Sequence, residues 1–243
     1  MRLAEPQRDL HVDAQASVTM ARRCEGWSSG EAFIYAIDRS EGAGLRKAAG
    51  ESADRYEERV SAVEKPDGSE LTYQARTRHN ARVTATQGKA RLAAAGGGEG
   101  ELAATYNRFT QKAALPPGTL GPVAARARLV EALAANRPGT FELRTVDILR
   151  FHRPLTESFL RLEAGDPAIE ASMPEALRDR ARELAGGRVW AVRRRALELN
   201  EFGDELWVVH ESGAIVRQIV QRQGLRLILD ARKLSIFPDP RCG

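Results

Sequence analysis

The sequence predicts a mainly β protein whose antiparallel sheet curls or closes, accompanied by two helices. Short stretches in which apolar and polar residues alternate recur along most of the 243 residues, and this is the periodicity of β-strands. Turns rich in glycine and proline separate these stretches at short intervals. Strands joined in this way form antiparallel sheets that close on themselves. Two further stretches space their apolar residues as helices do.

Composition indicates one folded domain over residues 10–243, preceded by a flexible N-terminus over residues 1–9. The sequence is 42% hydrophobic and 29% charged, which is typical of a globular protein. No apolar run reaches the length of a membrane span, so we expect a protein that does not cross the membrane. The N-terminus lacks the apolar core of a signal peptide, so an exported protein would be present here in its mature form.

The net charge of +4 does not by itself indicate nucleic-acid binding. The arginines are spread along the whole chain, and the tightest run, Arg193 to Arg195, lies in a strand-like stretch. Nucleic-acid sites combine such charge with interleaved aromatic residues or a recognisable module, and neither is present. We therefore expect no nucleic-acid partner.

The first half is predicted to be strands joined by tight turns. Pro66-Asp67-Gly68 has the composition of a hairpin turn, and Gln87-Gly88 is interpreted as a second one. The glycine cluster at 96–100 lies between strand-like stretches, so it is interpreted as a hairpin loop and not as a phosphate-binding loop. The expected strands cover residues 10–20, 27–38, 54–64, 70–78, 80–86, 89–94 and 102–106.

The second half is predicted to be a helix followed by another series of strands. Pro122 suits a first helical turn, and the helix is expected over Pro122–Asn136, with an apolar stripe that includes Val123, Ala127 and Val130. Residues 151–171 are ambiguous, since Leu155, Phe159 and Leu162 fit a short helix. Further expected elements are a second helix after the capping box at Ser172 and strands over 141–145, 188–200, 205–210, 214–223, 225–230 and 232–237.

No catalytic or metal-binding pattern is visible. The four histidines, His11, His79, His152 and His210, stand in unrelated contexts without metal-ligand spacing. The sequence also lacks the motifs of serine hydrolases, thiol oxidoreductases and P-loop proteins. We therefore predict a protein that is not an enzyme and has no cofactor.

Cys24 and Cys242 are the only cysteines. Their even number, the polar Pro-rich tail around Cys242 and the tendency of chain ends to fray all favour a disulfide, which requires an oxidising compartment. The alternative is two buried thiols in a cytosolic protein, because a free cysteine packs as a small apolar residue.

An ordered set of short motifs resembles the EipB-like cell-envelope integrity proteins of Gram-negative bacteria. The set runs from Cys24-Glu25-Gly26-Trp27 through Pro66-Asp67-Gly68 and Gly88-Lys89-Ala90 to Leu115-Pro116-Pro117-Gly118, and it ends on a C-terminal cysteine. The resemblance covers about residues 10–150 and the last strands. Residues 151–188 match poorly and are interpreted as an insertion that is atypical of the family.

The resemblance implies a periplasmic β-spiral: an antiparallel sheet, or half-open barrel, wound around a central helix. It also implies a disulfide between Cys24 and Cys242, and a shape similar to the periplasmic lipoprotein carriers, which hold acyl chains. It implies no catalytic residue. The function expected is support of cell-envelope integrity as a monomer. The alternatives are a protein-binding scaffold or chaperone and, less favoured, an enzyme.

A partly empty concave face is predicted from the small residues at inward positions. Alanines such as Ala75 and Ala104 leave room inside a curled sheet. We therefore expect an apolar groove between helix and sheet for a lipid, an acyl chain or an envelope protein, with tight core packing as the alternative. Its expected lining is Tyr56, Tyr73, Tyr106, Val130 and Ala75.

Overall fold

The structure, a computed structural model, describes most of the chain. The described residues are 8–11, 15–23, 26–37, 54–65, 67–79, 81–93, 97–106, 108–136, 139–148, 152–163, 166, 187–199, 203–222 and 225–237. They form one sheet of 14 strands and the helix α2 (Pro122–Ala134). The prediction of a mainly β fold is therefore confirmed. The second predicted helix, after Ser172, lies outside the described residues.

The strands follow the predicted succession along most of the chain. The first half contains β1 (Arg8–His11), β2 (Gln15–Arg23), β3 (Gly26–Ile37), β4 (Asp54–Glu64), β5 (Glu70–His79), β6 (Arg82–Arg91), β7 (Gly100–Tyr106) and β8 (Phe109–Leu115). The second half contains β9 (Thr140–Asp147), β10 (Arg153–Arg161), β11 (Val189–Ala196), β12 (Glu205–His210), β13 (Ile215–Arg222) and β14 (Leu225–Phe237).

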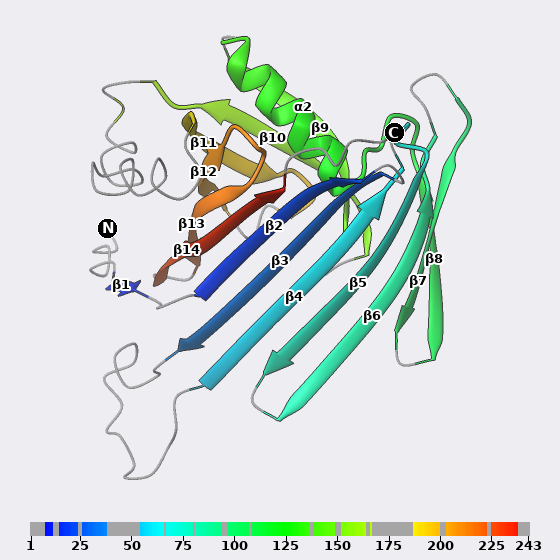
Figure 1. Cartoon of the computed structure of the whole chain (residues 1–243), viewed down its shortest axis with the longest axis horizontal. Coiled ribbons are helices and arrows are strands. Elements are labelled where there is room, and N and C mark those ends of the chain that lie inside the picture. Colours follow the sequence, from blue (N-terminus) through cyan, green and yellow to red (C-terminus); the bar gives the residue numbers. More distant parts are fainter. Residues whose placement is uncertain are drawn as a thin grey trace, which may run out of the picture.

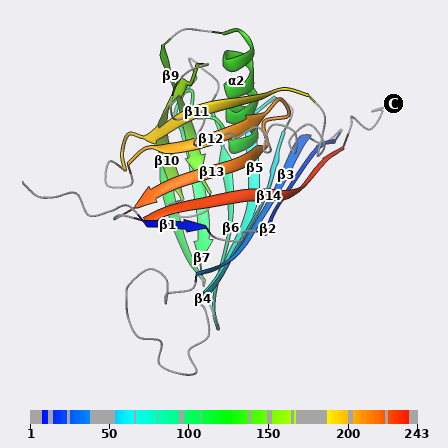
Figure 2. The ribbon, with the colours of Figure 1, turned by 90° about the vertical axis from the view of Figure 1, so that its left-hand side faces the viewer.

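The last strand joins the two halves of the sheet. The strand order is β8-β7-β6-β5-β4-β3-β2-β14-β13-β12-β11-β10-β9, and β1 pairs with β14 outside this path. All pairings are antiparallel except β14 with β2 and β14 with β1. Figure 1 shows the sheet curving from the strands β2–β8 to the strands β9–β13, with α2 beside β9 and β10. Figure 2 shows the same arrangement from the side. β8 and β9 are consequently the two edges.

Alternation along β4–β8 separates an inner face from an outer face. Ala62, Ala75, Ala90 and Ala104 are all buried, as expected for inward positions, and they share the inner face with Leu71, Tyr73 and Leu102. The turn at Gly68 is confirmed, because its φ is +69° and Gly68 N donates to Lys65 O over 2.9 Å. Small inner residues thus line this half of the sheet.

The predicted turn at Gln87-Gly88 is wrong. β6 runs without interruption from Arg82 to Arg91, and the chain reverses between His79 and Arg82 instead. Gly88 lies directly opposite Tyr73, and a Cβ atom built on Gly88 would overlap the Tyr73 ring. The glycine therefore makes room for a buried tyrosine on the neighbouring strand, where the sequence pattern indicated a bend.

Charged side chains from the sheet hold α2 at both ends. Glu64, at the end of β4, is 2% exposed, and its Oε1 and Oε2 accept hydrogen bonds from Val123 N (2.5 Å) and Ala124 N (3.1 Å). At the other end, Arg161 Nη1 donates to Leu133 O over 2.9 Å. A carboxylate at the N-terminus and a guanidinium at the C-terminus both complement the helix dipole.

α2 packs against the second half of the sheet. Its buried residues are Val123, Ala125, Leu129 and Leu133, whereas Ala127 is exposed, so the predicted stripe was rotated about the helix axis. Leu129 and Leu133 share a core with β10–β12, whose members are Phe159, Trp190, Val192 and Val209, and Val130 packs against it. A separate core lies on the inner face of β4–β8 and includes Val146 of β9 and Ile148, which follows that strand.

The helical interpretation of Leu155 and Phe159 is wrong. Both residues lie in β10, which pairs with β9 on one side and β11 on the other. Both are buried, with Glu157 between them on the same face. A spacing of four residues fits one face of a helix and also one face of a strand, and pairing with two neighbouring strands selects the strand.

Candidate functional site

The predicted groove residues on β5 and β7 do come together on the inner face. Tyr73 lies opposite Gly88, Ala75 opposite Thr86, and Thr86 opposite Tyr106. Tyr73 and Ala75 are buried, at 1% and 5% exposure. The part of the inner face around Tyr73 and Ala75 is therefore filled by protein atoms.

The inner face becomes exposed toward the hairpin that joins β7 to β8. Tyr106 and Phe109 lie directly opposite each other across this hairpin and are 39% and 79% exposed. By alternation they occupy the same face as the buried Leu102, Ala104 and Leu115. We call Tyr106 and Phe109 the aromatic pair. Two adjacent exposed aromatic side chains provide an apolar surface that continues the core into solvent.

On the buried side of this face, Tyr73 contacts His152. Tyr73 Oη lies 3.2 Å from His152 Nδ1, and the two rings are stacked with centroids 5.9 Å apart. Burial raises the pKa of Tyr73 to about 12, and the charge of Asp147 adds to that shift. Burial also lowers the pKa of His152, which Asp147 opposes. Both groups therefore remain neutral at pH 7, and their hydrogen bond ties the segment between β9 and β10 to β5.

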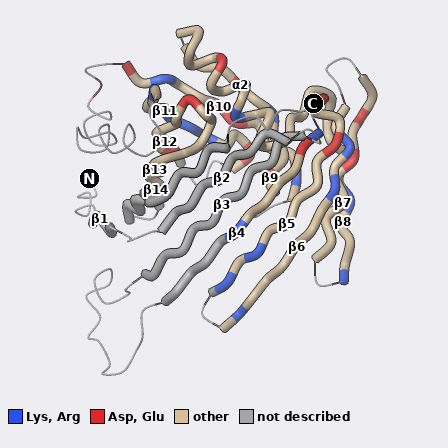
Figure 3. Tube along the Cα trace, in the orientation of Figure 1, with Lys and Arg blue, Asp and Glu red and all other residues tan. Residues whose placement is uncertain are grey.

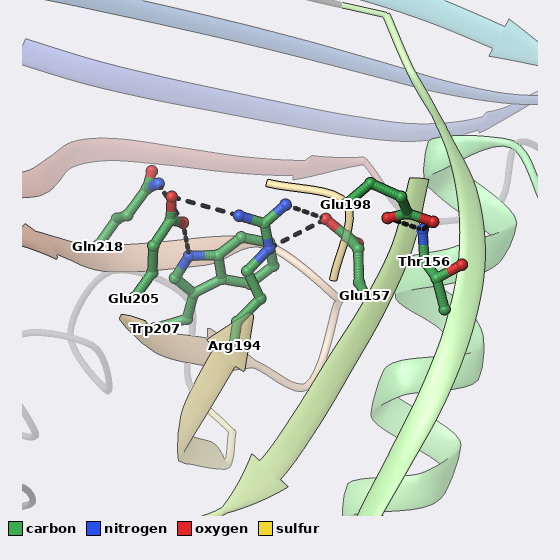
Figure 4. A network of polar contacts seen from close by, with 7 residues as sticks. All are labelled: Thr156, Glu157, Arg194, Glu198, Glu205, Trp207 and Gln218. Carbon is green, nitrogen blue, oxygen red and sulfur yellow. Dashed lines mark hydrogen bonds and ion pairs between the residues drawn. The ribbon is translucent and has the colours of Figure 1, made fainter. Parts of the chain in front are cut away.

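A second polar cluster lies among β10–β13, centred on Arg194. Figure 4 shows its guanidinium between two glutamates. Arg194 Nε donates to Glu157 Oε1 over 3.0 Å, a second bond joins Arg194 Nη2 to the same oxygen, and Arg194 Nη1 lies 3.2 Å from Glu205 Oε1. Glu205 Oε2 also accepts from Trp207 Nε1 (2.8 Å) and Gln218 Nε2 (2.9 Å). The Arg194 guanidinium stands 5.2 Å from the centre of the Trp207 ring.

These contacts give the Arg194 cluster a structural role. Burial lowers the pKa of Arg194, but Glu157 and Glu205 outweigh that effect and raise it. Burial raises the pKa of Glu157, and Arg194 opposes this shift. These residues bond to one another, so the cluster joins the four strands β10, β11, β12 and β13. Removal of one partner of such a buried pair would leave an uncompensated charge.

The other predicted site residues are not brought to the aromatic pair. Val130 packs on α2 in the core with Leu129 and Leu133, away from the core that contains Tyr73. Tyr56 lies in β4 opposite His79, and its side chain is outside the described residues. Cys24 and Cys242 also lie outside the described residues, so the disulfide remains a prediction.

Sequence reasoning missed the buried charged residues, although the pattern carried a signal for them. Arg194 stands inside the run Arg193 to Arg195, and strand alternation places only the middle arginine on the face of Phe159. Glu64 has the parity of the inward residue Ala62. Basic residues are distributed over several described strands and do not form one cluster, as Figure 3 shows.

In the described part of the chain, His, Cys, Asp and Glu form no group of three or more that is arranged to hold a metal ion. No helix within the described ranges is long and apolar enough to cross a membrane.

Comparison with known proteins yields a likeness of fold. The chain is similar to the crystal structure of a β-barrel-like protein of the domain of unknown function DUF1849 from Brucella abortus. The TM-score is 0.63 at 13% sequence identity, and the match covers 83% of this chain and 78% of the other. No family model matches the sequence, and no curated protein matches it. The shared feature is therefore the β-barrel-like fold.

Proposed function

We propose that this chain is an EipB-like periplasmic protein that supports cell-envelope integrity without catalysis and binds a hydrophobic ligand on its inner face. The single observation that carries the proposal is the aromatic pair. Tyr106 and Phe109 expose apolar surface on the same face as the buried core of β4–β8. Ala104, a small residue on the same face of β7 as Tyr106, is buried beside them. The β-barrel-like fold shared with the Brucella abortus structure supports the family assignment.

A titration with a fluorescent acyl probe tests ligand binding. The informative variant is Tyr106→Ser combined with Phe109→Ser, because both side chains are exposed and changes at exposed positions usually alter stability little. The matched control is Val83→Ser. Val83 is similarly exposed, at 44%, but by alternation it belongs to the outer face of β6.

We expect saturable binding by the wild type and by Val83→Ser, with at least a tenfold loss of affinity in the double variant. Equal binding by all three proteins would place the ligand elsewhere. Absence of binding by the folded wild type would overturn the carrier function.

Fractionation of the producing cells tests the compartment, since recovery of the protein in the cytoplasm would contradict the periplasmic assignment.

A further inference from the structure

β8 presents a free strand edge to solvent. It stands at one end of the strand order and pairs with β7 alone. Five of its seven residues are exposed, on both faces of the strand, and only Leu115 is buried. The opposite edge, β9, is partly covered, because Leu120 forms a bridge with Thr145 and hydrogen bonds with Arg144 and Val146. β10 packs near β8, but within the described residues no bridge or backbone hydrogen bond joins the outward edge of β8 to another segment.

The register of the β7–β8 hairpin identifies the outward backbone groups. Tyr106 and Phe109 flank a two-residue turn, and this position closes a hairpin with a hydrogen bond. Hydrogen-bonded and non-hydrogen-bonded pairs alternate along an antiparallel ladder. Phe109, Gln111 and Ala113 therefore bond to β7. The N–H and C=O groups of Thr110, Lys112 and Ala114 point away from it.

The β8 edge lacks most of the devices that protect edge strands. Edge strands are protected by charged side chains, especially lysine, and by prolines, bulges or inward-pointing charges. β8 contains no proline, and its pairing with β7 shows no register shift from Leu115 to Phe109. Its single charge is Lys112, whose parity places it on the outer face. Three consecutive outward residue positions are therefore available to an added strand.

Lys112 disfavours a second copy of this chain as the occupant. A symmetric antiparallel pairing that uses all three outward positions would place Lys112 opposite the same lysine of the other copy. Like charges directly opposite each other destabilise a strand pair. Lys112 Nζ is 3.1 Å from Glu101 Oε1, but both side chains are well exposed, at 68% and 48%, and exposed pairs contribute little. The ammonium also has three donors and can accept another partner.

We propose that the β8 edge binds an extended segment of another protein by strand addition. The backbone of the segment would pair with Thr110, Lys112 and Ala114. An Asp or Glu opposite Lys112 supplies complementary charge on the outer face. Apolar residues on either side of it would extend the inner face and pack beside Ala113 and the exposed Phe109. The proposal is independent of ligand binding on the inner face.

The test selects random nine-residue segments displayed on phage against the full chain. Ala114→Pro is the informative variant, since it removes an outward N–H without removing a bond to β7 or changing the charge. Ala114→Val is its control, because it keeps the N–H. Lys112→Glu reverses the charge at an exposed position. Sedimentation velocity of the wild type at the same concentrations measures self-association.

We expect enriched segments in which an acidic residue stands between apolar residues at alternate positions. A synthetic peptide of such a sequence should lose at least tenfold affinity with Ala114→Pro and should keep its affinity with Ala114→Val. Its affinity should fall by a smaller factor with Lys112→Glu, because exposed charge pairs contribute little. If the Ala114→Pro variant does not fold, the phage selection is repeated on Lys112→Glu. This variant should enrich segments with a basic residue in place of the acidic one. No enrichment, unchanged affinity in both variants, or a wild-type dimer lost in Lys112→Glu overturns the proposal.

Discussion

Glycine is required at position 88 because the side chain of Tyr73, on the neighbouring strand, occupies the space that a Cβ atom would need. The Gly88 backbone is extended within β6, so its conformation alone does not require glycine, but a Cβ there would overlap Tyr73. We predict that Gly88→Ala lowers the free energy of unfolding by about 1–3 kcal/mol, which is typical of overpacking a filled core. Denaturant unfolding measures the change.

The neighbouring Lys89 provides the control for Gly88. Its side chain is exposed on the opposite face, so Lys89→Ala should leave the free energy of unfolding within about 0.5 kcal/mol of the wild type. The combination of Gly88→Ala with Tyr73→Leu should cost less than the sum of the two single changes, because the overlapping ring is absent. Additive costs would show that the two residues do not share the space.

At the scale of the elements, Glu64 of β4 caps the N-terminus of α2. Burial raises the pKa of Glu64 above 4.5, although hydrogen bonds from Val123 and Ala124 oppose the shift. Because the folded protein holds the proton more tightly than the unfolded chain, this contribution to stability is full below about pH 4.5 and is lost as the pH rises through the folded pKa.

We therefore predict that the stability difference between wild type and Glu64→Gln changes with pH. The wild-type advantage should be largest in acid and should shrink as the pH rises above about 4.5, because the glutamine does not titrate. Denaturant unfolding across this range measures the difference. Glu70→Gln is the control, since Glu70 is exposed and pairs with Lys65. A difference that grows with pH would contradict the assigned shift for Glu64.

The orientation of α2 is a second prediction at the scale of the element. Leu129 is 2% exposed and packs in a core with Phe159, whereas Ala127 faces solvent. Leu129→Ala should cost about 2–5 kcal/mol of unfolding free energy, as is typical for a buried leucine. Ala127→Ser should cost less than about 1 kcal/mol, consistent with helix propensity alone. Equal costs in thermal melts would show that the helix is turned differently on the sheet.

At the scale of the whole molecule, the predicted link between Cys24 and Cys242 would enclose nearly the entire chain. A thiol assay on the unfolded, unreduced protein should find no free thiol. Chain entropy predicts a stabilisation of about 5 kcal/mol for so long a loop, and measured effects are commonly smaller. Because a large core already exists, we expect Cys242→Ser to cost half of that or less. Two titratable thiols in the wild type would contradict both the link and the proposed compartment.

Local sequence by itself determined most strands and turns of this protein. The alternation in β4 and β5, the turn at Gly68 and the start of α2 at Pro122 all depend on residues close together in the chain. The side-chain period of a strand and the fixed φ of proline act over this short range. These features were accordingly predictable, as were the inward alanines and the antiparallel pairing of neighbouring strands.

Only the tertiary structure decided the features that depend on contacts between distant residues. Gly88 continues a strand because Tyr73 needs its space, and Phe159 lies in a strand because β9 and β11 pair with β10. Glu64 caps a helix 59 residues away, and β14 enters the sheet between β2 and β13. A local pattern compatible with two conformations is resolved by packing and pairing, because these non-local contacts outweigh differences in intrinsic propensity.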